Sequence, residues 1–337
     1  MRRRALYLLL TAFTTACGGS SSPAPPTAPS PTPAPGESSK WSIGGTITDA
    51  ISGQGVANAT LLFTSFDAVT TDSGGRWQLA GSGASPGVEV FTSTITAPGF
   101  HERQTRIEWK TGGRSDVGLS LLPERSPFSL DFFRKLVRNA HEEPNELEPI
   151  RRWLSNPNFY LNAQNPRTNA KLTTAEIEMI ESTIRRVIPQ ITGGSLSAGF
   201  FDVGTSDRAQ RLGWINIEVV FEPEEDYCAQ AFVGTNPGLI TINYDACRLS
   251  WCRESISPNV LAHEVGHAMG LWHVPGGMMV AELDDCYGTT FSQNEQLHAR
   301  LAYQRPNGNV DIDRDPVTFQ AVTTGGAPLV TCRSRRR

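Results

Sequence analysis

The sequence lacks the patterns that mark several common enzyme classes. It contains no serine or cysteine nucleophile elbow, no phosphate-binding loop and no dinucleotide fingerprint. Positive charge is not in excess either, because the 337 residues carry a formal net charge of −4 and the dense basic runs stand only at the two ends. We therefore expect no nucleic-acid partner.

Long hydrophobic runs are also missing beyond the N-terminus, so any attachment to a membrane needs a lipid. Residues 1–17 place three arginines before a short apolar stretch and end Thr14-Thr15-Ala16-Cys17, which is typical of an export signal. A small residue before Cys17 resembles the bacterial lipobox, although Thr14 stands where that pattern usually has leucine. The resemblance implies a membrane-anchored lipoprotein lipidated on Cys17 and located outside the cytoplasm. An ordinary cleaved secretory signal is the alternative.

Cysteine is scarce, and beyond Cys17 it occurs only in the C-terminal half, at Cys228, Cys247, Cys252, Cys286 and Cys332. Export favours disulfides, and five cysteines permit two bridges with one residue left over. The sequence leaves their pairing open. A structural zinc site at Cys247 and Cys252 is disfavoured, because no histidine lies near them and the compartment is oxidising.

Composition divides the chain into segments. Residues 18–40 are rich in Pro, Ser, Ala, Gly and Thr and form a disordered tether. Residues 41–123 contain short alternating runs separated by turn signals, which predict a small antiparallel β-sandwich. The segment resembles the carboxypeptidase regulatory-like domain, an immunoglobulin-like module, at Gly45-x-Ile47-x-Asp49, Gly55-Val56, Thr71-Asp72-x-x-Gly75-x-Trp77, Ala97-Pro98-Gly99-Phe100 and Val117-x-Leu119-x-Leu121. That resemblance implies a spacer or weak binding platform, without catalysis.

Residues 128–320 mix helical and strand patterns, so the fold class is α+β. We expect a helix from Thr173 to about Ile188, ended by Pro189, and a last helix over 293–304. Alternation predicts strands over 214–220 and 239–244. Residues 321–337 are expected to be a C-terminal tail.

The strongest chemical signal is the run His263-Glu264-Val-Gly-His267-Ala-Met-Gly270-Leu-Trp-His273. Ser257 and Pro258 predict a helix start, and two histidines four residues apart on that helix face one ion. Gly270 allows the chain to turn back so that His273 becomes the third ligand. Three protein ligands leave the fourth position open, which is typical of a catalytic zinc site, and Glu264 is placed to act as its general base.

These residues resemble the metzincins, zinc endopeptidases with the motif His-Glu-x-x-His-x-x-Gly-x-x-His and a following methionine turn. The resemblance implies ligands at His263, His267 and His273, the base at Glu264, the turn at Gly270 and the methionine at Met278 or Met279. The gap to either methionine is shorter than in the matrix-metalloproteinase branch, so the branch stays open. The resemblance also implies that residues 239–244, including Ile240, Ile242 and Asn243, form an antiparallel edge strand that an extended peptide joins.

We therefore expect an endopeptidase with one catalytic zinc ion that uses activated water to cleave peptide bonds of extracytoplasmic proteins. A zinc-binding adhesive lipoprotein without turnover and a zinc hydrolase of a non-protein amide are the alternatives. No separate propeptide carries a cysteine able to occupy the zinc, so latency by that route is not expected. Asp311-x-Asp313-x-Asp315 faintly resembles a Ca²⁺ loop, and Glu295 with His298 is read as a solvated helix face. The oligomeric state stays open.

Overall fold

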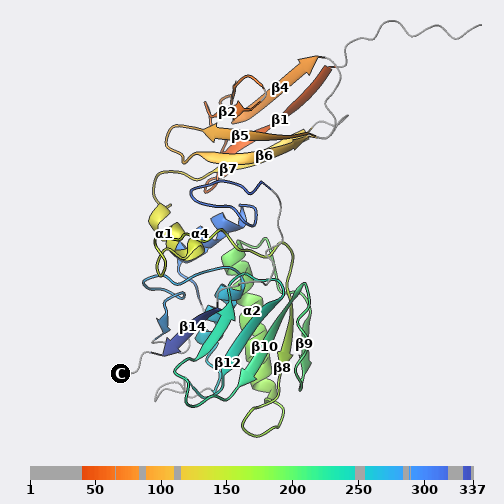
Figure 1. Ribbon diagram of the computed structural model, residues 1–337, viewed down its shortest axis with the longest axis vertical. Coiled ribbons are helices and arrows are strands. Elements are labelled where there is room, and N and C mark those ends of the chain that lie inside the picture. Colours follow the sequence, from red (N-terminus) through yellow and green to blue (C-terminus); the bar gives the residue numbers. More distant parts are fainter. Residues whose placement is uncertain are drawn as a thin grey trace, which may run out of the picture.

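The computed structural model shows a mixed α+β protein with a β-sandwich at one end and a larger sheet covered by helices at the other (Figure 1). It describes residues 40–64, 66–82, 89–109, 115–246, 255–283, 288, 290–317 and 329–334. The signal peptide, Cys17, most of the tether, Cys247, Cys252 and Cys286 lie outside the described residues. No helix in the described part of the chain is long and apolar enough to cross a membrane.

The sandwich packs a three-stranded sheet against a four-stranded one. Its strands are β1 (Lys40–Asp49), β2 (Thr60–Phe63), β3 (Val69–Thr70), β4 (Arg76–Ser82), β5 (Glu89–Thr96), β6 (Arg103–Trp109) and β7 (Ser115–Leu121). The sheet orders are β4-β1-β7 and β3-β2-β5-β6. Alternate residues such as Ile43, Ile47 and Ile107 are buried between the sheets. The pairing of β1 with β7 is parallel, whereas the sequence predicts a wholly antiparallel sandwich.

The second part is built on a seven-stranded sheet of order β13-β14-β11-β12-β10-β8-β9. Its elements are α1 (Leu130–Arg138), β8 (Asn158–Asn162), α2 (Thr174–Thr192), β9 (Phe201–Gly204), β10 (Trp214–Val220), β11 (Ala229–Phe232), β12 (Gly238–Asn243), α3 (Pro258–Ala268), β13 (Glu282–Leu283), α4 (Gln293–Tyr303) and β14 (Leu329–Ser334). Strands β9, β8, β10 and β12 run parallel, and β11 is antiparallel to both β12 and β14.

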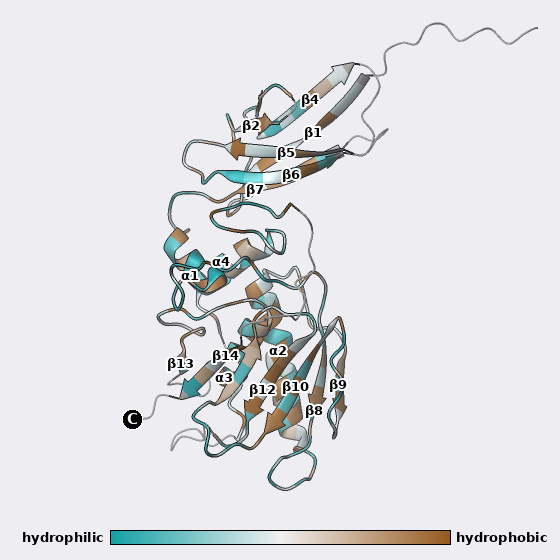
Figure 2. Ribbon diagram, viewed as in Figure 1, coloured by the Kyte–Doolittle hydropathy of each residue, from teal (hydrophilic) through white to brown (hydrophobic). Residues whose placement is uncertain are grey.

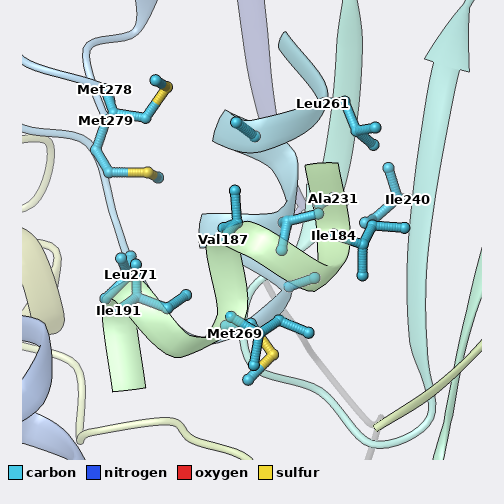
Figure 3. Close-up of a cluster of buried hydrophobic side chains, with 14 of the residues drawn as sticks. Ile184, Val187, Ile191, Ala231, Ile240, Leu261, Met269, Leu271, Met278 and Met279 are labelled. Atoms are coloured by element: carbon cyan, nitrogen blue, oxygen red, sulfur yellow. The ribbon is translucent and has the colours of Figure 1, made fainter. Parts of the chain in front are cut away.

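Apolar residues of the sheet and of α2 and α3 form one buried core. Strands β8, β10 and β12 carry the brown of hydrophobic residues in Figure 2. Ile184 and Val187 of α2 lie beside Leu261 of α3 and Ile240 of β12 (Figure 3). Burial of these side chains removes apolar surface from water and stabilises the fold by about 25 cal/mol for each Å² buried. This packing fixes α3 on the sheet and with it the motif residues.

Helix α2 begins as predicted and ends later. Thr173 is its N-cap and forms a capping box with Glu176. Pro189 does not end the helix, which continues to Thr192 with Gly193 in the left-handed conformation. Proline lacks a donor but keeps its acceptor, and the Pro189 carbonyl accepts hydrogen bonds from the N–H groups of Gly193 and Gly194. The buried side chains of Ile188 and Ile191 carry the packing into this last turn.

Two expectations about the sheet are wrong. Residues 239–244, with Ile240, Ile242 and Asn243, do not form an edge strand, because β12 lies between β10 and β11. The strand that runs antiparallel to β12 is β11, and its four residues form a pattern too short to recognise in the sequence. Residues 321–337 are not simply a tail either, because β14 within them pairs with β11. That pairing joins segments about a hundred residues apart, which sequence alternation does not report.

The three aspartates considered for Ca²⁺ bind arginines. Asp311 accepts hydrogen bonds from Arg134, Asp313 from Arg305, and Asp315 from Arg103 of β6. The Arg305 and Asp313 side chains are fully buried. The pair of Arg103 with Asp315 and the backbone bond from Gln104 N to the Asp313 carbonyl join the sandwich to the larger sheet domain.

Candidate metal centre

Helix α3 carries the first two histidines of the motif. It begins at Pro258 with Ser257 as N-cap, as the sequence predicts. His263 and His267 lie one turn apart, and both are fully buried. The last carbonyls of the helix are satisfied by other parts of the chain: His267 O accepts from Gly234 N, Ala268 O from Trp153 Nε1 and Met269 O from the Tyr303 hydroxyl.

Gly270 turns the chain toward the third histidine. Its φ of 105° lies in the region that favours glycine, and a Cβ there would stand 1.8 Å from the carbonyl oxygen of Arg151. The turn therefore requires glycine both for its backbone conformation and for the close approach of Arg151. After this turn the backbone N–H of Trp272 donates to Leu136 O of α1 at 2.7 Å, which places His273 next to α3.

The three histidines converge on one point. Nε2 of His263 lies 2.8 Å from Nε2 of His267 and 3.3 Å from Nε2 of His273, and the remaining pair is 3.2 Å apart. Three nitrogens at the zinc–nitrogen distance of 2.0–2.1 Å in tetrahedral geometry would be about 3.3 Å from one another. Two of the three separations match this value, and the third is shorter.

Each imidazole is fixed through its other nitrogen. Nδ1 of His263 lies 2.7 Å from Met278 O, and Nδ1 of His267 lies 2.7 Å from Leu271 O. Nδ1 of His273 lies 2.5 Å from Oε1 of Glu142. Carbonyl and carboxylate oxygens only accept, so each Nδ1 carries a proton and the Nε2 of each ring is the atom left to coordinate a metal. Three lone pairs facing one another repel unless a cation lies between them, so these residues fit a metal ion.

Burial keeps two of the rings neutral. It lowers the pKa of His263 to about 3, with a further contribution from the neighbouring His273 ring. Burial also lowers the pKa of His267 well below its ordinary value. The pKa of Glu142 is lowered first by its hydrogen bond with His273, so this carboxylate stays charged. At neutral pH the two helix histidines need lose no proton before they bind a metal.

Glu264 is a buried carboxyl group with unused hydrogen-bonding capacity. Both oxygens are fully buried and find no hydrogen-bond partner among the described residues. Burial raises the pKa of Glu264 well above its ordinary value. One carboxylate oxygen lies within 4.8 Å of a ring nitrogen of His263. An orphaned carboxyl group next to three converging imidazoles is what a site for metal-activated water requires.

Both candidate methionines of the loop after His273, Met278 and Met279, contact α3. The Met278 carbonyl binds His263, whereas the Met279 side chain packs beneath α3 at Gly266. A Cβ on Gly266 would stand 2.5 Å from the Met279 sulfur, so a side chain at this helix position would have to displace that of Met279. Figure 3 shows the two methionines next to one another on their loop.

Sequence reasoning missed two carboxylates that support the centre. Glu142 orients His273, and nothing local in the sequence marks it. Glu295 is fully buried and accepts from the backbone N–H of Met279 at 2.9 Å. Because Glu295 and His298 are both buried, the reading of this helix face as solvated is wrong. The motif Ser292-x-x-Glu295 signals a capping box, and Glu295 forms that box as well.

The described cysteines have different surroundings. Cys228 is disulfide-bonded. Cys332 of β14 is fully buried, and its sulfur lies within 4.8 Å of a ring nitrogen of His263 and of a Glu264 oxygen. The C-terminal strand therefore reaches the candidate centre.

Comparisons with known proteins assign no family. No family model matches the chain, and no curated protein matches it. Among solved structures it is similar over 26% of its length to the Bacillus anthracis TIE protein (18% identity, 17% of that chain, TM-score 0.22) and to a DUF3823 family protein from Parabacteroides merdae (13% identity, 48% of that chain, TM-score 0.20). Chlorocatechol 1,2-dioxygenase from Pseudomonas putida shares 12% identity over 26% of this chain and 60% of that chain, with a TM-score of 0.18. The chain thus spans between about a sixth and three fifths of these proteins.

Proposed function

We propose that this chain is a zinc-dependent endopeptidase of the metzincin type that cleaves peptide bonds of proteins outside the cytoplasm. The observation that supports this most is the convergence of three Nε2 atoms, each on a ring whose Nδ1 is held by an acceptor, beside an orphaned buried carboxyl group. In this proposal His263, His267 and His273 hold one zinc ion. The sandwich is a spacer, and Cys17 carries the lipid.

Zinc, when bound there, polarises the scissile carbonyl and makes hydroxide available near neutral pH. Glu264 performs the proton transfers, accepting a proton from water and delivering it to the departing amine. Its pKa is raised by burial, and a cation a few ångströms away favours the charged carboxylate. Metal binding is therefore expected to make Glu264 competent as a base.

The oxygen atoms that accept from the histidine rings have a separate task. Met278 O, Leu271 O and the Glu142 carboxylate fix the orientation of all three rings before any ligand binds. Such preorganisation lowers the free-energy cost of ordering the ligands and holds the reacting groups in place during turnover.

The test uses casein and a mixed peptide library with three proteins: the native chain, Glu264→Ala, and Glu181→Ala on the solvent side of α2. Native protein and Glu181→Ala are expected to hold about one zinc and to cleave internal bonds. Glu264→Ala should keep its zinc and lose at least about a hundredfold in rate, since general-base catalysis contributes that much or more. A native chain that holds zinc but cleaves nothing, also after removal of residues 329–337, would refute the proposal.

A further inference from the structure

Strand β14 lies along the one side of β11 that the rest of the sheet leaves open. Ala229 stands opposite Cys332 and Phe232 opposite Leu329 in this antiparallel pairing. The other side of β11 is paired with β12, and the outer neighbour of β14 is the two-residue strand β13. Without β14, β11 would be the edge of the sheet, with main-chain donors and acceptors open to another extended chain.

The same strand contacts the candidate metal centre. It packs on α3, and the Cys332 sulfur lies within 4.8 Å of both His263 and Glu264. Glu264 is fully buried with both oxygens unpartnered among the described residues. A substrate must bring its scissile bond within hydrogen-bond reach of this base. An extended chain in the position of β14 passes beside Glu264, and β14 already fills that position.

The side chains of β14 show what this position accommodates. Val330 and Cys332 point to the buried face, whereas Arg333 is exposed. Val330 packs with Val233 and Trp272, and Trp272 directly precedes the ligand His273. The inward positions therefore accept a β-branched apolar side chain and, two residues further, a small one, in keeping with the two-residue period of a strand.

We infer that β14 is an internal occupant of the peptide-binding edge of this protein. The C-terminal strand holds the place of an extended peptide substrate along β11 and restrains access to the centre. The peptides that the edge prefers carry a β-branched apolar residue in the place of Val330 and a small residue in the place of Cys332. Main-chain hydrogen bonds to β11 give affinity, and the alternate side chains give selectivity. This inference rests on the proposed function for the location of catalysis.

The first experiment measures binding without turnover. A chain ending at Pro328 and the full chain, both zinc-loaded and both carrying Glu264→Ala, are titrated into a fluorescent peptide Leu-Val-Thr-Ala-Arg-Ser and followed by anisotropy. Alanine replaces cysteine so that no thiol of the probe can bind zinc. A tethered strand competes at an effective concentration of about a millimolar, so the full chain should bind the probe at least about tenfold more weakly than the shortened chain.

Three controls make the result specific. A chain ending at Ser334 keeps β14 and should bind the probe as weakly as the full chain. A probe with aspartate in place of valine should lose at least about tenfold in affinity for the shortened chain, because a charge would be buried between Val233 and Trp272. Zinc content and far-UV circular dichroism show whether the shortened chain folds.

If the shortened chain does not fold, full-length Val330→Pro takes its place. Backbone groups alternate along a strand, and since Cys332 O accepts from Cys228 N, the N–H of Val330 also faces β11, so proline removes a donor from this pairing. Val330→Ile keeps the strand and serves as its control. Val330→Pro should bind the probe at least about tenfold more tightly than Val330→Ile, and equal binding would overturn the inference.

Cleavage assays with Glu264 intact separate this inference from the proposed function. A shortened chain that binds the probe but cleaves no peptide refutes the peptidase proposal and leaves β11 as a peptide-binding edge blocked by β14. A full chain that binds the probe and cleaves as well as the shortened chain refutes the inference and leaves the peptidase proposal standing. The inference predicts that the shortened chain exceeds the full chain in both measurements.

Discussion

Oε1 of Glu142 accepts a hydrogen bond from Nδ1 of His273 across 131 positions of sequence. Glu142 follows α1, which ends at Arg138 with Asn139 in the left-handed conformation. The same helix accepts the backbone N–H of Trp272 at Leu136 O. Helix α1 and the loop after it thus hold His273, the one histidine of the candidate centre that α3 does not carry.

Loss of the Glu142 carboxylate should weaken the metal site without unfolding the protein. Glu142→Ala frees the His273 ring to rotate and to change tautomer, and removal of such a partner typically costs 10–100-fold in metal affinity or activity. Competition with a zinc chelator measures the affinity directly. Glu143→Ala, the exposed neighbour, is the matched control and should match the native affinity. Equal affinities in both variants would contradict a positioning role for Glu142.

A side chain at Gly266 should lower the stability of the protein. In Gly266→Ala the new Cβ would meet the Met279 sulfur at 2.5 Å, and overpacking of a buried site costs about 1–3 kcal/mol. Urea denaturation measures the loss, with Gly118→Ala on the exposed face of β7, where nothing lies within 4 Å, as control. Because Met279→Ala removes the sulfur that the new Cβ would meet, the double variant should lose less stability than the sum of the two single losses. A double variant whose loss equals or exceeds that sum would argue against this contact.

The ligand motif and its helix could be predicted because their determinants are local. The four-residue spacing of His263 and His267 and the Ser257-Pro258 start lie within three turns of one helix. The same holds for the capping box of α2 at Thr173. Features that join distant segments could not be predicted. Glu142 and its hydrogen-bond partner His273 are too far apart in sequence for any spacing rule.

The sheet edge was misassigned for a related reason. Alternation favours residues 239–244 because that run is long and β-branched, whereas β11 reads Ala-Gln-Ala-Phe and carries almost no strand signal. Which strand is central depends on partners from elsewhere in the chain. Glu295 shows the same limit, since its capping box is visible in the sequence but its bond to Met279 N is not.

Metal-free protein should lose stability as the pH falls below 6.5. Burial lowers the pKa of His263 from 6.5 to about 3 and that of His267 well below 6.5. Between the folded and the unfolded pKa values the unfolded chain binds more protons than the folded one, so the free energy of unfolding decreases as the pH is lowered. Each histidine contributes a slope of up to about 1.4 kcal/mol per pH unit.

Glu264 has the opposite effect on stability above its ordinary pKa of 4.5. Its pKa is raised in the folded state, so at these pH values the folded chain holds a proton that the unfolded chain has lost, and stability rises as the pH falls. Metal-free Glu264→Gln should therefore lose stability more steeply than the native chain between pH 6.5 and 4.5. Urea denaturation at several pH values measures both slopes. A slope equally steep with and without Glu264 would contradict its buried protonation.

The stability of the sheet domain should depend on the buried ion pair of Arg305 with Asp313, which lies next to the joint with the sandwich. Both side chains are fully buried, with Nε 2.8 Å from Oδ1, and Asp313→Ala would leave the Arg305 charge buried without its carboxylate. Breaking such a pair from one side costs about 3–5 kcal/mol. Asp202→Ala removes the exposed partner of Arg208 and should cost less than about 1 kcal/mol. Urea denaturation of the zinc-loaded chains compares the two, and similar losses would show that the buried pair is not required. Asp313→Asn should fall between them, because it keeps acceptor and volume but not the charge.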